Sequence, residues 1–371
     1  MGALDGLRIA DFSRVLAGPY ATMLLADMGA EVIKVERPGV GDDTRTWGPP
    51  FDADKNATYF QSVNRNKRGL TADLSSELGR RKALNLIETC YVVVENFAVG
   101  TMEKFGLGYE DLSQKFPQLI YCSISGFGTS DKAQDLPGYD LLVQAMSGLM
   151  SITGPQGAPS KVGVALMDVV AGLHASLGIV SALHHRNEQG QGQKIEINLL
   201  SSALSAMVNQ TGAFAGAGVI SQSMGNAHPS IAPYEVYQAS DKPFVVAVGN
   251  DAQFAKFCET IGADFVKDIR FISNPKRVQH RAELNALLAP LLASNTAKHW
   301  TKELTKVGVP AGPINTIAEA VALAESLSLN PIVKITDPRD SSKSKTIANP
   351  ITFSQTPVEY RLGPPALGID D

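Results

Sequence analysis

The sequence predicts an α/β protein built around a parallel sheet. Residues 7–12 and 31–36 have the composition of strands, and residues 18–28 between them form a helix that ends at Gly29. Two parallel strands joined by a helix make a βαβ unit with a right-handed crossover. The same alternation recurs further along, and a chain of 371 residues is long enough for two domains.

Further strands and helices follow in turn as far as residue 198. We predict helices at 78–89, 141–150 and 169–184 and strands at 91–95, 119–123, 162–167 and 194–198. After residue 205 the composition shifts toward Ala, Gly and Ser. The next predicted elements are a strand at 244–248 and helices at 252–261, 277–293 and 297–307.

These elements group into two domains. We expect a large domain made of residues 1–205 and 316–371, a linker at 206–224 and a small domain at 225–315. The proline-rich tail is expected to lie along the large domain.

The composition argues against several classes of protein. Lys and Arg total 33 against 37 acidic residues, a formal charge of −4, whereas nucleic-acid-binding proteins normally carry a basic excess. No apolar run approaches the roughly 18 residues of a membrane-spanning helix, so we expect no membrane segment. The three cysteines are isolated and the N-terminal residues lack a secretion signal, which favours reduced thiols and a cytoplasmic enzyme.

The common cofactor motifs are missing from the sequence. The turn after the first strand, residues 13–19, has no GxGxxG pattern, although Glu36 stands where a dinucleotide-binding protein carries its ribose-binding acid. Glu36 is equally an ordinary carboxylate at a strand end. The sequence also contains no P-loop, HExxH or GxSxG motif, and its six histidines show no ligand spacing. We therefore expect no catalytic metal and no permanently bound cofactor.

Asp168 stands out by its position between the predicted strand 162–167 and the helix that follows. That helix carries a stripe of apolar residues that we predict to be buried: Val170, Leu173, Leu177 and Val180. Free backbone N–H groups and the helix dipole would favour an ionised carboxylate at this point. Such a group suits covalent acyl transfer, but aspartate is also a common N-cap residue. The pattern alone leaves both interpretations open.

Short motifs in a fixed order along most of the chain resemble those of the family III CoA-transferases. This group contains formyl-CoA transferase, carnitine CoA-transferase and the α-methylacyl-CoA racemases. The motifs are at residues 4–12, 16–19, 29–36, 66–68, 94–97, 126–128, 138–140, 147–148, 153–154, 168 and 190–193.

The resemblance implies the chemistry, because the catalytic aspartate of the family falls at Asp168. That carboxylate would attack a donor acyl-CoA to form an acyl-aspartyl anhydride, and returning CoA would form an aspartyl-CoA thioester. A free carboxylic acid would then accept the CoA, so neither ATP nor a metal is required. A racemase of the same family and a non-catalytic CoA-binding protein are the alternatives.

The resemblance also implies which residues bind acyl-CoA. The family's CoA-binding positions map to Leu16, Ala17, Arg37, the stretch 72–75 (which includes Leu74), Asn96, Phe97, Lys104 and Tyr139. Cations suit the phosphates of CoA, and flat or apolar surfaces suit its adenine. Tyr139 would lie near the thioester.

The sequence departs from parts of the family in ways that bear on the substrate. Racemases carry a histidine where this chain has Tyr139, and a phenol, which titrates at about pH 10, is a poor base at neutral pH. Formyl-CoA transferases have a glutamine matching Leu16, a lysine near Ser75 and a long glycine-rich loop in place of residues 225–230. We therefore expect succinyl-CoA or a similar donor and a dicarboxylate acceptor, whose distal carboxylate would meet Arg14 or His228.

The resemblance finally implies an assembly. In this family a Rossmann-like large domain and a smaller α/β domain form a ring-like chain, and two chains interlock into a homodimer. We accordingly expect a cytoplasmic homodimer whose partners are acyl-CoA and a carboxylic acid.

Overall fold

The computed structural model describes residues 2–133 and 136–371, which divide into two compact units. The large unit contains the chain up to Leu149, Lys161–Ile220 and Leu329–Asp371, and the small unit contains Met150–Ser160 and Ser221–Ser328. Residues 150–160 and 316–328 therefore group with the small unit. Most of the expected linker groups with the large unit.

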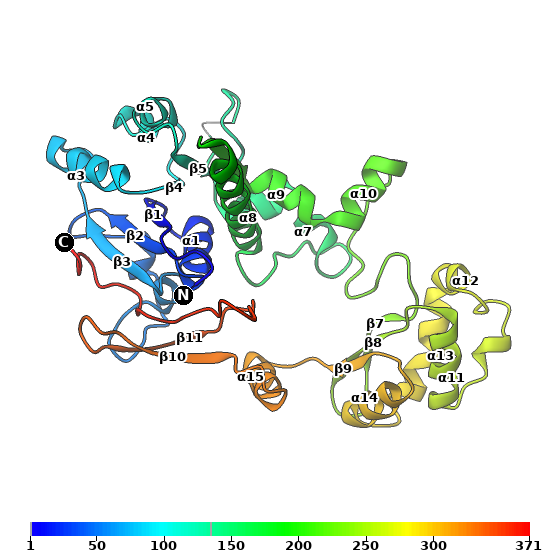
Figure 1. Cartoon of the computed structure of the whole chain (residues 1–371). Helices are drawn as coiled ribbons and strands as arrows, with labels where there is room; N and C mark the ends of the chain where they lie inside the picture. Colours follow the sequence, from blue (N-terminus) through cyan, green and yellow to red (C-terminus); the bar gives the residue numbers. More distant parts are fainter. Residues whose placement is uncertain (1, 134–135) are drawn as a thin grey trace. The chain divides into compact units, whose positions relative to one another are not determined.

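The large unit is built on a six-stranded parallel sheet (Figure 1). Its strands are β1 (Arg8–Asp11), β2 (Glu31–Glu36), β3 (Lys67–Thr71), β4 (Val92–Glu95), β5 (Ile120–Ser125) and β6 (Lys194–Asn198). Their order is β3-β2-β1-β4-β5-β6, which is the order of a Rossmann fold. The predicted α/β class and Rossmann-like parallel sheet are thus confirmed.

Helices lie on both faces of this sheet. The helical segments of the large unit are α1 (Ala17–Asp27), η1 (Asp43–Thr46), α2 (Thr58–Val63), α3 (Glu77–Glu88), α4 (Thr101–Lys104), α5 (Tyr109–Lys115), α6 (Asp140–Met146), α8 (Leu166–Gln189), α9 (Leu199–Ala206) and α10 (Val208–Ala217). Helices α1 and α8 share a core with one face of the sheet. Helices α3, α4 and α5 share a core with the other face. Alternate residues of one strand point to the two faces, so Ile9 joins the first core and Ala10 the second.

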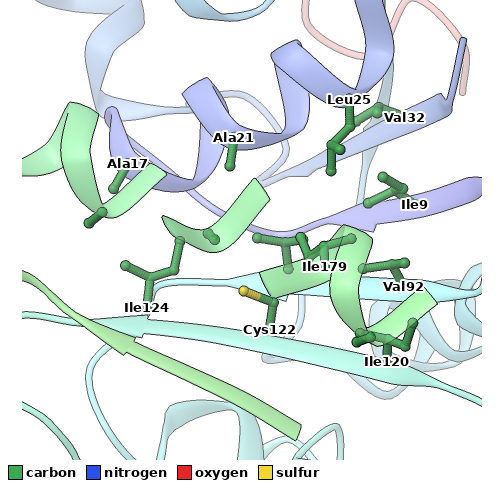
Figure 2. Packing of buried hydrophobic residues seen from close by; sticks show 14 of the residues in the cluster. Ile9, Ala17, Ala21, Leu25, Val32, Val92, Ile120, Cys122, Ile124 and Ile179 are labelled. Carbon is green, nitrogen blue, oxygen red and sulfur yellow. The ribbon is translucent and has the colours of Figure 1, made fainter. Parts of the chain in front are cut away.

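The packing of α1 and α8 depends on small side chains. Figure 2 shows Ala17 and Ala21 of α1 and Ile179 of α8 among strand residues such as Ile9 and Val92. Gly172 of α8 lies so close to α1 that a Cβ built there would stand 2.6 Å from the carbonyl oxygen of Ala17. Small residues therefore let the two helices approach closely.

The prediction for the start and the buried side of α8 was wrong. Residues 162–165 form no strand, and the helix begins at Leu166. Three of the four residues of the predicted stripe face outward: Leu173, Leu177 and Val180 are 47%, 67% and 42% exposed, whereas Val170 is partly buried against the core. The buried side carries mostly small residues instead, namely Met167, Ala171, Gly172, Ala175, Ile179 and Ala182. Periodicity could not separate the two sides, because this helix is apolar all round.

Helix α8 also bears on the expectation about membrane segments. It is the one helix in the described parts of the chain that is long and apolar enough to cross a membrane, by length and composition. The expectation that no segment would reach that length was therefore wrong. A core helix meets the same criterion, and α8 shares the core of α1 and the sheet.

The small unit has its own antiparallel sheet and hydrophobic core. The sheet has the order β7-β8-β9, with β7 (Tyr234–Gln238), β8 (Pro243–Ala247) and β9 (Ala311–Pro313). Its helical segments are α11 (Asp251–Ile261), η2 (Phe265–Lys267), α12 (Asn274–Gln279), α13 (Arg281–Leu292), α14 (Ala297–Lys306) and α15 (Ile317–Ser326). Phe244, Phe257, Leu288 and Trp300 lie in its core. The helix predicted at 277–293 is divided at His280 into α12 and α13.

Two helices lie in connecting segments, and the C-terminal tail belongs to the large unit. The expected linker at 206–224 contains helix α10, which its alanines favour, and the residues of α7 (Leu149–Ile152) are divided between the two units. From Leu329 the tail belongs to the large unit, where β10 (Ile332–Thr336) and β11 (Lys343–Ile347) pair antiparallel. The end of the tail lies beside β3, because the N–H of Asp370 donates to the carbonyl of Gly69 at 3.0 Å.

Candidate active site

Two adjoining cavities open where β1, β4 and β5 end. Each has a volume of about 320 Å³, and Arg14, Asp43 and Phe97 line both of them. Strands β1 and β4 are neighbours in the sheet, and their crossovers lead to opposite sides. Ligands of open parallel sheets bind at such a switch point, outside the carboxyl ends of the strands. We call the cavity that contains Asp168 the first cavity and the other the second cavity.

Asp168 lines the first cavity from the first turn of α8. It is the third residue of the helix, and the N-cap position is held by Ala165, which makes no side-chain capping bond. The N-cap interpretation was therefore wrong. Within the described residues no hydrogen bond or ion pair engages the Asp168 carboxylate, whose pKa responds only to burial and to one neighbouring charge. Its oxygens are available to a substrate.

Burial and the charge of Asp140 raise the pKa of Asp168 to about 7. The expectation that the helix terminus would favour the ionised form was wrong. Desolvation and like-charge repulsion disfavour the charged form, and in the described residues Asp168 accepts no N–H of the helix terminus that would offset them. The carboxylate is thus divided between its two forms near neutral pH.

The neighbouring Asp140 takes the capping role instead. Its Oδ1 accepts a hydrogen bond from the N–H of Met167 at 2.8 Å, and its Oδ2 accepts one from Nε2 of Gln144 at 2.6 Å. The buried Gln144 amide also donates to the carbonyl of Val164 at 3.2 Å and accepts from the N–H of Val162 at 2.8 Å. Helix α6 thereby fixes the segment that leads into Asp168.

Asp140 and Gln144 were not among the site residues predicted from the sequence. The available signal was their spacing of four residues on one predicted helix, directly after Tyr139. Close approach of two loops brings this helix to the site: a Cβ on Gly126 would overlap the backbone of Gly138. These glycines therefore serve contact between loops.

Tyr59 of α2 is a third residue near Asp168 that the sequence did not indicate. Burial and the charges of Asp168, Asp140 and Asp42 raise the pKa of Tyr59 to about 12, so its hydroxyl stays protonated near these carboxylates. Its ring packs edge-on against Trp47, with 5.4 Å between the ring centroids. No motif in the sequence connects residue 59 with residue 168.

Most residues predicted from the family pattern line the cavities. Those that line the first cavity with Asp168 are Leu16, Ala17, Asn96, Phe97 and Tyr139. Arg37, Leu74 and again Phe97 line the second cavity. Lys104 lines neither: it is exposed at the end of α4, beside Thr101 and Phe105, which do line the second cavity.

The second cavity combines apolar walls with a cation. Val35, Leu74, Phe97 and Phe105 supply apolar surface, and the exposed Arg37 supplies positive charge. This combination suits a flat ring attached to phosphates. Glu36 is an ordinary carboxylate at a strand end rather than a free ribose ligand, because Arg45 binds its carboxylate with two hydrogen bonds of 2.8 and 2.6 Å.

Of the two residues considered for a distal carboxylate, only Arg14 lines the cavities. Its guanidinium lies over the Phe97 ring at 4.9 Å and is 3.5 Å from the Asp43 carboxylate. His228 belongs to the small unit, where its Nδ1 accepts from the N–H of Ser230 at 3.1 Å. In the described ranges, no group of three or more His, Cys, Asp or Glu side chains is placed to hold a metal ion.

Comparison with known proteins identifies the family that the chain matches and several similar CoA-transferases. Residues 4–371 match CoA-transferase family III. The chain is 42% identical to the succinate–glutarate CoA-transferase of Agrobacterium fabrum, over 98% of this chain and 93% of that protein. It is 40% identical to the acetyl-CoA:oxalate CoA-transferase of Acetobacter aceti, over 90% of this chain and 86% of that protein.

A solved structure shows the same agreement in three dimensions. The crystal structure of a CAIB/BAIF family protein from Brucella suis has a TM-score of 0.87 and 42% identity, and covers 99% of this chain and 97% of its own. The resemblance recognised in the sequence motifs is confirmed. Similarity of this extent over nearly the whole chain means that the protein belongs to CoA-transferase family III and is a CoA-transferase.

Proposed function

We propose that the protein transfers CoA from an acyl-CoA donor to a free carboxylic acid through covalent intermediates on Asp168. The observation that carries this proposal is the state of Asp168: a partly buried carboxylate without a hydrogen-bond partner in the described residues, facing a cavity of about 320 Å³. A carboxylate used only for structure would be paired. A nucleophile needs free lone pairs.

The reaction is a series of acyl exchanges. An oxygen of Asp168 attacks the thioester carbonyl, a C–O bond forms, the C–S bond breaks and CoA leaves as thiolate. The thiolate attacks the aspartyl carbonyl of this anhydride, releasing the donor acid and leaving an aspartyl-CoA thioester. The acceptor carboxylate displaces the thiolate to form a second anhydride, whose acceptor carbonyl the thiolate then attacks. The products are the acceptor's CoA ester and the free Asp168 carboxylate.

The two cavities divide the acyl-CoA substrate between them in this proposal. The nucleotide end of CoA lies in the second cavity, against Phe97 and Leu74 and near Arg37. The thioester reaches the first cavity beside Leu16, Ala17, Asn96 and Tyr139. Lys104 adds positive charge outside the cavity wall, and CoA enters as a substrate with no permanently bound cofactor.

A dicarboxylate is the proposed acceptor, and Arg14 is the proposed contact for its distal carboxylate. Arg14 is the one cationic side chain among the described residues that line the first cavity. The carboxylates of Asp43, Asp140 and Asp168 also line that cavity, so an anionic acceptor needs such a cation. The relatives named for glutarate and for oxalate both act on dicarboxylates, and succinyl-CoA is the donor that we propose to test first.

We also propose a homodimer. Leu177 of α8 and Phe214 of α10 belong to a set of large apolar side chains that the isolated chain leaves exposed, together with Leu173, Val180, Leu204 and Val208. Soluble chains rarely expose this much apolar surface without a partner. Light scattering should give twice the chain mass of 39.5 kDa.

A cytoplasmic location stays a prediction, in keeping with three unpaired, buried cysteines.

The proposed function can be tested with a panel of acids. The protein is incubated with succinyl-CoA or acetyl-CoA and with succinate, glutarate, oxalate, mesaconate and matched monocarboxylates, and mass spectrometry identifies new CoA esters. We expect new esters with the wild type and none with Asp168→Ala, whose fold is checked by circular dichroism. An active Asp168→Ala variant would contradict the role of Asp168. Incorporation of deuterium at the α-carbon without transfer would favour the racemase.

A further inference from the structure

The turn that precedes α1 holds a β-branched residue in an unfavourable conformation. Val15 has a φ of +66°, in the left-handed region that residues other than glycine, Asn and Asp seldom occupy. A side chain with two branches at Cβ is among the least suited to this region. Surrounding interactions must therefore hold the turn in place.

Side chains from three other segments supply these interactions. The N–H of Arg14 donates to Oδ1 of Asn96 at 2.8 Å, and Nδ2 of Asn96 donates back to the carbonyl of Arg14 at 2.8 Å. The N–H of Val15 donates to Oδ2 of Asp42 at 3.2 Å. Nζ of Lys34 donates to the carbonyl of Ser13 at 2.9 Å. Each residue from 13 to 15 is thus held through its backbone.

Asp42 is itself fixed by a buried ion pair. Nζ of Lys34 lies 2.8 Å from Oδ2 of Asp42, and neither side chain is exposed to solvent. Oδ1 of Asp42 accepts from the N–H of Thr44 at 3.0 Å. Lys34 keeps the pKa of Asp42 low, at about 2, so the carboxylate is charged at neutral pH. A charged, immobile acceptor holds the N–H of Val15 more strongly than a neutral one.

The held turn leads directly into the wall of the first cavity. Leu16 and Ala17 follow Val15, line that cavity with Asp168 and begin α1. Leu16 occupies the N-cap position without a side-chain capping bond, so the turn and its supports determine how these residues face the cavity. Rotation of Val15 out of the left-handed region would redirect all of residues 14–17.

We propose that Asp42 and Asn96 are positioning residues: they hold Val15 in its left-handed conformation and so place residues 14–17 against the thioester that Asp168 attacks. This inference rests on the proposed function of the first cavity. It also gives Asn96 a different role from the CoA contact implied by the family pattern, because both polar atoms of its amide already bind the backbone of Arg14.

The test uses glycine, which adopts a positive φ without the penalty that valine carries. The enzymes compared are wild type, Val15→Gly, Asn96→Ala and the double variant. We expect Asn96→Ala to lower kcat about 10-fold or more, because small displacements in an active site are costly. Val15 itself lines the first cavity, so Asn96→Ala is compared with its own parent in each background, and its loss of kcat should be at least about 3-fold smaller in the Val15→Gly background than in wild type.

Each alternative outcome has a defined meaning. If Asn96 mainly contacts CoA, Asn96→Ala raises the KM for acyl-CoA, and Val15→Gly gives no recovery, which overturns the proposal. Asp42→Asn with and without Val15→Gly repeats the test, and thermal unfolding identifies variants that fail to fold. Asn96 carries the main test because its replacement leaves no buried charge unpaired. An active Asp168→Asn variant would contradict the proposed function itself, independently of any recovery.

Discussion

Asp140 binds the N-terminus of α8 through Met167, and its charge raises the pKa of Asp168 in the first turn of the same helix. Oδ1 of Asp140 lies 2.8 Å from the N–H of Met167, and with burial its charge brings the pKa of Asp168 to about 7. One carboxylate thus fixes the position of the other and, in addition to burial, raises the pH at which it ionises. A more basic carboxylate is also a better nucleophile once it is ionised.

The first prediction concerns the pH dependence of transfer. In the proposed mechanism Asp168 must be ionised to attack, so kcat/KM should rise with pH and reach half its plateau near pH 7. Asp140→Asn removes the repelling charge and should move this midpoint to lower pH. Initial rates between pH 5 and 9 give the midpoints.

Asp43→Asn is the matched control for that experiment. Asp43 also lines the first cavity, but its charge does not contribute to the raised pKa of Asp168. Its replacement should leave the midpoint in place. An unchanged midpoint in Asp140→Asn would mean that Asp140 does not set the ionisation of Asp168.

The second prediction concerns stability. The pKa of Asp168 rises from its ordinary value of 3.8 to about 7 on folding, so the folded state binds the proton more tightly. The stabilisation from this proton is complete below about pH 4 and is lost as pH rises to about 7. Asp168→Asn avoids the loss and should be more stable than wild type at pH 8, on the order of 1–2 kcal/mol with allowance for partial exposure. Thermal unfolding at pH 5 and pH 8 measures the difference.

The comparison between the two pH values serves as the control. The advantage of Asp168→Asn should shrink at pH 5, where the wild-type carboxyl is protonated in the folded state. An equal advantage at both pH values would point to packing of the amide rather than to burial of a charge.

Local patterns were enough to predict the central strands but could not predict the edge strand β3. In β1 and β2 the residues alternate between the two cores, and apolar side chains make this visible in the sequence. In β3 the sequence Lys-Arg-Gly-Leu-Thr looks polar. Its buried Lys67 is accommodated by an ion pair with Asp11, 3.0 Å away. That partner is 56 positions distant in the chain, where no periodicity can reveal it.

The same limit applies to the site. The pattern singled out Asp168, and only the resemblance to a family gave it a role. The pKa of Asp168 depends on burial and on Asp140. The turn that contains Val15 depends on hydrogen bonds with Asp42 and Asn96. These side chains are brought together by the fold and not by their spacing in the sequence. Sequence spacing shows which residues share an element. It does not show which carboxylate lies against another element.

The third prediction concerns the choice of acceptor. If Arg14 binds the distal carboxylate, Arg14→Gln should lower kcat/KM for a dicarboxylate by about 10- to 100-fold, the usual effect of losing a hydrogen bond between charged groups. A monocarboxylate of equal length should change less than about 3-fold, since it has no distal charge to bind. Competition between the two acceptors in one incubation gives the ratio directly.

Arg37→Gln is the control for the acceptor experiment. Arg37 lines only the second cavity, so its loss should raise the KM for every acyl-CoA and leave the ratio of acceptors unchanged. If Arg37→Gln shifts the ratio and Arg14→Gln does not, the assignment of the distal carboxylate to Arg14 is wrong.

The fourth prediction concerns the spacing of the two helices that meet at the site. A Cβ on Gly172 would stand 2.6 Å from the carbonyl oxygen of Ala17, so Gly172→Ala must push α8 away from α1. Asp168 lies one turn earlier on α8 and should move with it. We expect kcat to fall about 10-fold or more, and stability to fall by about 1–3 kcal/mol although alanine is the better helix former.

Gly178→Ala on the same helix separates this effect from a general effect of alanine. A Cβ there meets only the side chain of Ile195, at 3.1 Å, and a side chain can shift where a backbone carbonyl cannot. This variant should keep kcat within about 3-fold of wild type, since the small adjustment lies away from Asp168. Steady-state rates and thermal unfolding of both variants decide the question. Equal kcat values would show that the spacing of α1 and α8 does not position the Asp168 carboxylate for reaction, because the two substitutions differ mainly in the element that they displace.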